Sequence, residues 1–163
     1  TTTTGMFAPG IGYGISDKLI AGINLGIYSE TYKPDGGGKI KTSAFAAGPF
    51  IRYTKKMGEI FSMYGQANLS YLGGKRETNN GYGQVITYTQ SGVGFNIIPN
   101  IGIDVGKGWG LDFAFGALEF SSIAEKNKDD NDAKTTDTDF GLNLSGSSLR
   151  VGISYMFNCS KKE

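Results

Sequence analysis

The sequence predicts an all-β protein, an antiparallel up-and-down β-barrel, and three features of its 163 residues carry that prediction. Apolar and polar residues alternate with period two over most of the chain, which is typical of strands with two different faces. The composition is rich in residues that suit a tightly curved sheet, with 26 Gly, 10 Phe and 9 Tyr. The connections between alternating segments are short at one end and long at the other.

The alternation is clearest from Phe61 to Tyr71. Its odd positions are Phe, Met, Gly, Ala, Leu and Tyr, whereas its even positions are Ser, Tyr, Gln, Asn and Ser. The same test predicts further strands at 3–15, 19–28, 44–53, 92–105, 109–117 and 138–157. In the segment 109–117 the predicted outward residues are Trp109, Leu111, Phe113, Phe115 and Ala117.

The connections alternate in length along the chain. Short turns are expected at 16–18, 55–58 and 106–108, and long polar loops at about 29–41, 73–87 and 121–137. Short turns on one side and long loops on the other are the pattern of bacterial outer-membrane barrels.

The second face of each strand predicts that the apolar face meets lipid. A soluble sheet places Lys, Glu, Thr and Arg on its solvent side, but here that face is mostly Gly, Ala, Ser, Asn and Gln. Small side chains fit the narrow interior of an eight-stranded barrel. A charge at the bilayer midplane costs about 2–4 kcal/mol, and none of the predicted outward positions is charged. The alternative is a soluble ligand-binding β-barrel, which would remain in solution without detergent.

Aromatic residues recur near the predicted short-turn ends, where a membrane interface attracts them. The predicted interface residues are Tyr13, Tyr53, Phe61, Trp109 and Phe157. The last strand closes on Tyr155 and Phe157, which resembles the terminal signal that the barrel assembly machinery recognises. We therefore expect the barrel to occupy residues 1–157 and a short periplasmic tail to occupy residues 158–163.

The predicted strand count is odd, at about seven, if 138–157 is one long strand kinked near Ser145–Ser148, where the apolar phase changes. Outer-membrane barrels have an even number of strands and periplasmic termini. We therefore expect a first strand upstream of Thr1, absent here or in an unassigned segment, or an edge strand supplied by another envelope protein. The alternative is a turn at Ser145–Ser148, which would give eight strands within the chain.

The residues predict no catalytic, cofactor or metal site. The chain has no His, which excludes the Ser–His and Asp–His mechanisms of barrel enzymes, so we expect a non-enzyme. The acidic run from Asp129 to Asp132 lacks the EF-hand spacing. The near balance of 16 basic and 15 acidic residues argues against nucleic acid as a partner. We expect the signal peptide to have been removed.

Six polar residues are predicted to face the lumen, where buried charges must find partners. They are Arg52, Gln66, Asn68, Asp104, Asp112 and Arg150. We expect both arginines to pair with Asp104, Asp112 or lumen water. The set is interpreted as a plug that fills the barrel, with a narrow passive pore as the alternative.

Several segments together resemble a known family. They are Ala8–Tyr13, Ser16–Leu19, Gly22–Gly26, Ala47–Tyr53, Phe140–Leu144 and Tyr155–Phe157. In order and spacing they resemble the small outer-membrane β-barrel ("porin family") proteins of Bacteroidetes. The resemblance implies an eight-stranded OmpA/OmpX-like barrel in contact with outer-membrane lipid and lipopolysaccharide, and it implies no activity. We therefore expect a structural or interaction role, through surface loops or as a subunit of an envelope complex.

Overall fold

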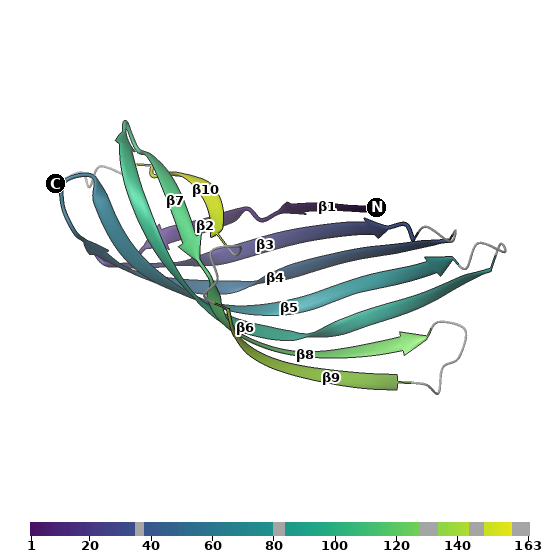
Figure 1. Cartoon of the computed structure of the whole chain (residues 1–163). Coiled ribbons are helices and arrows are strands. Elements are labelled where there is room, and N and C mark those ends of the chain that lie inside the picture. Colours follow the sequence, from purple (N-terminus) through teal and green to yellow (C-terminus); the bar gives the residue numbers. More distant parts are fainter. Residues whose placement is uncertain (35–37, 80–83, 128–133, 144–148, 158–163) are drawn as a thin grey trace.

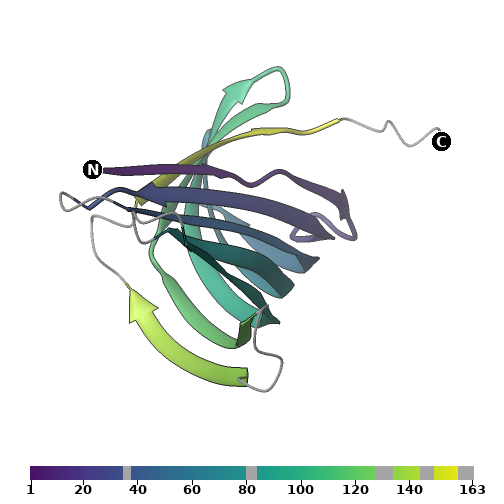
Figure 2. The same ribbon diagram turned by 90° about the vertical axis from the view of Figure 1, so that its right-hand side faces the viewer.

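The protein is a single curled antiparallel sheet, seen in a computed structural model that describes residues 1–34, 38–79, 84–127, 134–143 and 149–157. The sheet bends into a half-barrel (Figures 1 and 2). The described residues form no helix, and therefore none long and apolar enough to cross a membrane.

Ten strands make up the sheet, and their bounds follow the chain. They are β1 (Thr2–Phe7), β2 (Gly10–Gly14), β3 (Leu19–Tyr32), β4 (Lys39–Lys56), β5 (Phe61–Asn79), β6 (Val85–Gly106), β7 (Trp109–Phe115), β8 (Ala117–Asn127), β9 (Lys134–Asn143) and β10 (Leu149–Tyr155). Strands that follow one another in the chain pair with each other, except where one stretch of chain is interrupted and forms two strands in line. The all-β, antiparallel prediction is confirmed at this level.

Three stretches of the chain, β1–β2, β7–β8 and β9–β10, are each interrupted and so form two strands in line. β1 and β2 both pair with β3, and β7 and β8 both pair with β6. β9 pairs with β8 and β10 with β7, so β9 and β10 run in the same direction. β9 and β10 therefore do not form the hairpin that the alternative of a turn at Ser145–Ser148 requires. The predicted kink itself lies at 144–148, outside the described residues.

Proline explains where the ladders are interrupted, because it has no backbone N–H to donate. Pro9 separates β1 from β2, although its carbonyl still accepts a hydrogen bond from the Leu25 N–H at 2.9 Å. Pro49 pairs with β3 but not with β5. Pro99 pairs with β5 and lies opposite the break between β7 and β8. The sheet therefore divides beyond β6 into two arms (Figure 1).

Gly116 reverses the faces of the β7–β8 run. Its φ is 71°, a left-handed conformation that glycine adopts without a steric penalty. Before it, Phe115 faces outward; after it, Leu118 faces outward beside Ile97. The prediction that Ala117 faces outward is wrong, because this one-residue bulge turns Ala117 inward, where it is 2% exposed. On the neighbouring run the outward residues change from even positions in β9 to odd positions in β10.

The strands extend further toward the long-loop end than predicted. β3, β5 and β8 continue to Tyr32, Asn79 and Asn127, so the connections there are shorter than expected. Apolar alternation stops in these extensions, but hydroxyl and charged residues continue the ladder in pairs such as Glu30 with Thr42. Hydrophobic periodicity alone therefore located the middle of each strand and missed its polar end.

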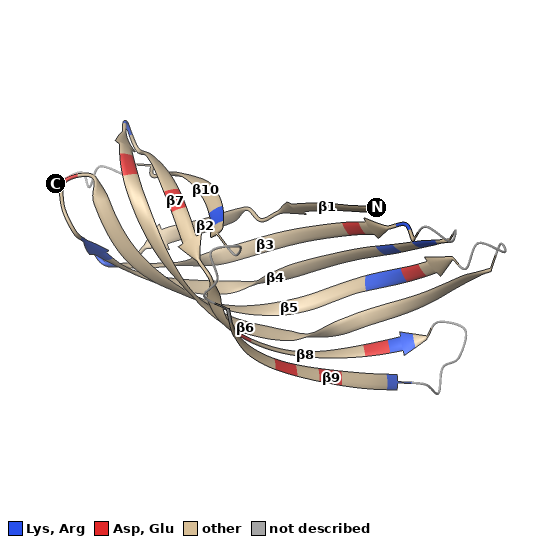
Figure 3. Ribbon diagram, viewed as in Figure 1, with Lys and Arg blue, Asp and Glu red and all other residues tan. Residues whose placement is uncertain are grey.

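The two outer edges of the sheet have no strand partner among the described residues. β1 and β2 form one edge, and β9 and β10 form the other. The antiparallel order makes both edges run in the same direction. Charged residues gather toward the two ends of the strands, and the middle of the sheet is nearly free of them (Figure 3).

Candidate functional site

The face that carries the predicted lumen residues is concave, as its hydrogen bonds indicate. Two of these bonds join strands that are not neighbours. Asn24 on β3 reaches across β4 to Asn68 on β5, and Arg76 on β5 reaches across β6 to Glu125 on β8. Side chains can meet across an intervening strand only where a sheet curves toward them. We call this the concave face and its opposite the outward face.

An amide network crosses the middle of the concave face. The Asn24 and Gln66 side-chain amides donate to the Asn68 Oδ1 at 2.5 and 2.8 Å, and the Asn68 Nδ2 donates to the Asn96 Oδ1 at 2.6 Å. Asn68 is only 6% exposed, so these bonds satisfy a buried polar group. The network joins β3, β5 and β6 and fixes the curvature there.

Arg52 extends this network toward the short-turn end. Its Nε and Nη2 both donate to the Gln66 Oε1, at 2.9 and 2.8 Å. Its guanidinium carbon lies 4.1 Å from the centre of the Tyr64 ring, whose negative face attracts a cation. Arg52 therefore interacts with an amide and an aromatic ring instead of the carboxylates that were expected to pair with it.

Of the other predicted lumen residues, Asp112 adjoins this network, and Asp104 and Arg150 lie apart from it. Asp112 lies beside the Tyr64 hydroxyl. Asp104 accepts a hydrogen bond from the Gly106 N–H at 2.8 Å and therefore stabilises the turn after β6. Arg150 forms its ion pair with Glu119, at 3.6 Å, which differs from the expected Asp104 or Asp112. The structure thus brings together Arg52, Gln66 and Asn68, with Asp112 next to them through Tyr64, and it places Asp104 and Arg150 elsewhere.

A second polar cluster on the concave face lies nearer the long-loop end and was not predicted. The Arg76 Nη2 lies 2.8 Å from the Glu125 Oε1, and the Gln90 Nε2 donates to the Glu125 Oε2 at 2.8 Å. The Arg76 guanidinium also lies over the Tyr88 ring. Glu119 escaped the sequence reasoning because the reversal at Gly116 brings odd-numbered β8 residues to this face, and Glu125 escaped it because residues 121–137 were predicted to be a loop. Asn24 and Asn96 share the parity of the predicted set, a signal that could have included them.

The outward face carries a wide band of exposed apolar side chains, which we call the apolar belt. Its members on the strands include Ile11, Ile23, Leu25, Ile27, Phe45, Ile51, Phe61, Met63, Leu69, Tyr71, Val93, Phe95, Ile97, Phe115, Phe120, Phe140, Leu142, Val151 and Ile153. Toward the long-loop end the belt ends at Lys41, Lys75 and Glu77. Toward the short turns it ends on β4 at Lys55, which pairs with Met63.

The predicted interface aromatics are all exposed. Tyr13, Tyr53 and Phe61 lie on β2, β4 and β5 toward the short turns. Trp109 and Phe157 both contact Tyr155, with ring centres 4.9 and 4.7 Å apart in edge-to-face geometry. The proposed assembly signal, Tyr155 and Phe157, is therefore part of one aromatic cluster with the single Trp.

The described part of the chain brings together no three His, Cys, Asp or Glu residues that could hold a metal ion. Its concave polar groups bind one another and can hold a shape or occlude a lumen. No protein-family model matches the chain, and no curated protein matches it.

Proposed function

We propose that this chain is a non-enzymatic outer-membrane β-barrel with a structural or interaction role. The observation that carries the proposal is the apolar belt, because its large side chains are exposed on strands throughout the sheet. Soluble monomers rarely expose an apolar patch of more than a few hundred Å². In lipid the same side chains are in their preferred environment.

The height of the belt suits a bilayer. On β5 its apolar positions run from Phe61 to Tyr71; Lys75 lies beyond one end, and Lys55 and Lys56 on β4 pair with Met63 and Ser62 near the other. At about 3.3 Å per residue and a tilt of about 40°, this stretch rises about 25 Å, the height of the apolar band of such barrels.

Closing the barrel requires one further strand. Both edges of the sheet run in the same direction, so antiparallel closure needs a strand that runs the opposite way. Unpaired backbone groups in lipid cost several kcal/mol each. We therefore propose an eight-stranded barrel whose closing strand comes from outside residues 1–163 or from another envelope protein. Barrel assembly machinery, recognising Tyr155 and Phe157, would insert it beside outer-membrane lipid and lipopolysaccharide.

The amide network favours a structural role over a passive pore. It joins Asn24, Asn68 and Asn96 across the concave face with short hydrogen bonds. A narrow barrel with such a layer leaves little room for a continuous water column. We expect no single-channel conductance in planar bilayers.

The test is gel mobility of the detergent-refolded chain, cold and boiled, alone and with a closing strand added at its N-terminus. A closed barrel resists unfolding in cold SDS and migrates differently from the boiled form. We expect the shift only when the closing strand is present. A chain that stays monodisperse without detergent would instead support the soluble barrel and overturn the proposal.

A further inference from the structure

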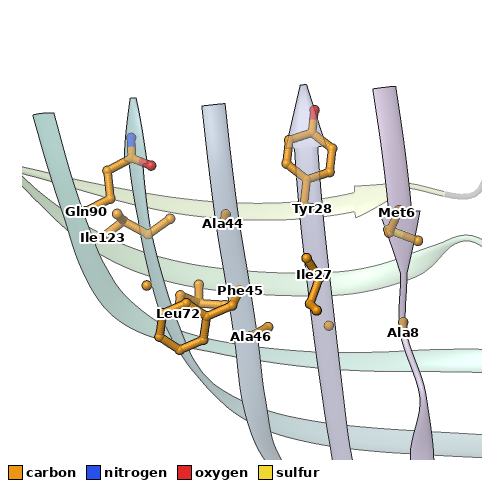
Figure 4. Close-up of a pocket in the computed structure, with 12 residues that line it drawn as sticks. Met6, Ala8, Ile27, Tyr28, Ala44, Phe45, Ala46, Leu72, Gln90 and Ile123 are labelled. Atoms are coloured by element: carbon orange, nitrogen blue, oxygen red, sulfur yellow. The ribbon is translucent and has the colours of Figure 1, made fainter. Parts of the chain in front are cut away.

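A hollow of about 260 Å³ lies on the concave face, on the long-loop side of the amide network (Figure 4). Its floor is made of small residues and its walls of large apolar ones. These are Gly26 and Ala46 for the floor, and Met6, Tyr28, Leu72 and Ile123 for the walls.

The hollow exists because the register stacks small residues in adjoining rows. Gly26 pairs with Ala46, which pairs with Leu72, and Tyr28 pairs with Ala44 in the next row. The next row on the other side of the floor carries Asn24 and Gly48, and the row beyond it carries Asn68 and Phe50. The hydrogen-bonded amides of Asn24 and Asn68 close that end. The hollow therefore has a closed bottom and opens toward the long loops.

The chemistry of the hollow favours hydrocarbon over water. The side chains of Leu72 and Ile123 beside the floor, and of Met6 in the row of Tyr28, offer no hydrogen bond. An apolar protein cavity of about 150 Å³ stays dry and binds benzene. By that comparison, 260 Å³ has room for about ten carbon atoms.

The mouth of the hollow is polar and carries excess negative charge. Figure 4 shows the polar ends of Tyr28 and Gln90 at the same end of the hollow. The Tyr28 hydroxyl donates to the Glu30 Oε2 at 2.6 Å, and Gln90 donates to Glu125. Arg76 pairs with Glu125 and leaves Glu30 uncompensated by an ion pair in this cluster. An anionic head group would be repelled here.

We propose that this hollow binds one alkyl chain of about ten carbons whose head group carries no negative charge. The head lies at Tyr28 and Gln90, and the chain points toward the amide network. The inference rests on the proposed function, because closure of the barrel completes the wall beside Met6. On this inference the barrel interior is a binding site closed at one end, and its ligands are uncharged or cationic amphiphiles with one alkyl chain.

Adjacent alanines of β4 provide a matched pair of variants. Ala46 lines the hollow, whereas Ala47 faces outward beside Leu25 and Tyr71. Ala46→Leu fills the hollow, and Ala47→Leu makes the same change on the belt. Gly26→Ala is a milder second variant, because an added Cβ would meet only Ala46, with its Cβ at 3.6 Å and its carbonyl oxygen at 3.9 Å.

The experiment is a methyl-NMR titration of the full chain, with its closing strand, in bilayer nanodiscs with 1-decanol. We expect saturable shifts at Ala46 and Leu72 in the wild type and in Ala47→Leu. In Ala46→Leu we expect at least tenfold weaker binding at Leu72, with a smaller loss in Gly26→Ala. Decanoate at neutral pH should bind at least tenfold more weakly than 1-decanol.

Three results would overturn the inference: no saturation in the wild type, saturation unchanged in Ala46→Leu, or equal binding of decanoate. Cold and boiled gel mobility is recorded on each sample. A barrel that is inserted and heat-modifiable but does not bind 1-decanol contradicts this inference alone. Failure to insert contradicts the proposed function instead.

Discussion

The outward and concave faces of this sheet belong to the same strands but meet opposite requirements. Leu69, on the outward face, is 56% exposed and has no polar partner, whereas the adjacent Asn68 is 6% exposed and joins three side chains. The outward face needs only the right class of side chain, because lipid adapts to its shape. The concave face needs particular partners at particular distances, because side chains converge there.

The largest change in folding stability should come from placing a charge in the middle of the apolar belt. Leu69→Arg puts a cation where the proposed bilayer is deepest, and we expect a loss of about 2–4 kcal/mol in folding stability in lipid. Leu69→Ile keeps the apolar class and should change stability little. Equilibrium urea unfolding in lipid vesicles measures both. Equal stability of the Arg variant and the wild type would contradict a lipid-facing belt.

On the concave face, Arg52→Met keeps an elongated side chain but removes both hydrogen bonds to Gln66. We expect a loss of about 1.5–3 kcal/mol, because the Gln66 carbonyl loses a charged donor. Arg52→Lys retains the charge but not the two-pronged geometry and should recover part of the loss. The same unfolding measurement distinguishes them. If Met and Lys variants behave alike, the charge of Arg52 contributes nothing.

Glycines on the two faces should also differ in how much stability is lost when a Cβ is added. A Cβ at Gly48 would collide with the backbone of Leu69 and Ser70, whereas a Cβ at Gly65 would meet nothing within 4 Å. We expect Gly48→Ala to destabilise by about 1–3 kcal/mol. Gly65→Ala should be neutral or slightly stabilising. Similar values for both variants would show that β4 and β5 do not approach as closely as the structure has them.

A smaller effect is expected from the aromatic cluster near the short turns. Trp109→Leu stays apolar but removes the edge-to-face contact with Tyr155. We expect a loss of about 0.5–1.5 kcal/mol beyond the change in buried area. A double-mutant cycle with Tyr155→Leu isolates that coupling. A coupling energy of zero would mean that the rings meet without contributing to stability.

The smallest expected effect is a shift in the pKa of a carboxyl group beyond the apolar belt, that of Glu77. The hydrogen bond from Lys75 holds the pKa of Glu77 below its usual range, and the charges of Lys75, Lys41 and Lys39 act in the same direction. The ion pair is therefore present above the usual Glu pKa and is lost as the pH falls through the lowered value. NMR titration of the Glu77 carboxyl should show that Lys75→Gln raises this pKa, whereas Lys55→Gln leaves it unchanged. An unchanged value in Lys75→Gln would contradict the pairing.

Much of the arrangement could be predicted because period-two alternation assigns each residue to a face without reference to its neighbours. That reasoning found seven runs, the side of Leu69 and Asn68, and the inward positions of Arg52 and Gln66. It failed where a single residue changes the phase. Gly116 turns Ala117 inward and brings Glu119 to Arg150, and nothing local distinguishes Gly116 from the other glycines in the strands.

The sequence by itself determined the all-β class, the antiparallel order and which side chains share a face within each uninterrupted strand, since these depend on local alternation and turn chemistry. Only the tertiary structure decided which of those side chains meet. The degree of curvature lets Asn24 reach Asn68 across a strand, and the register stacks Gly26 beside Ala46 to leave a hollow. Both depend on distances between strands far apart in the chain, which no local pattern encodes.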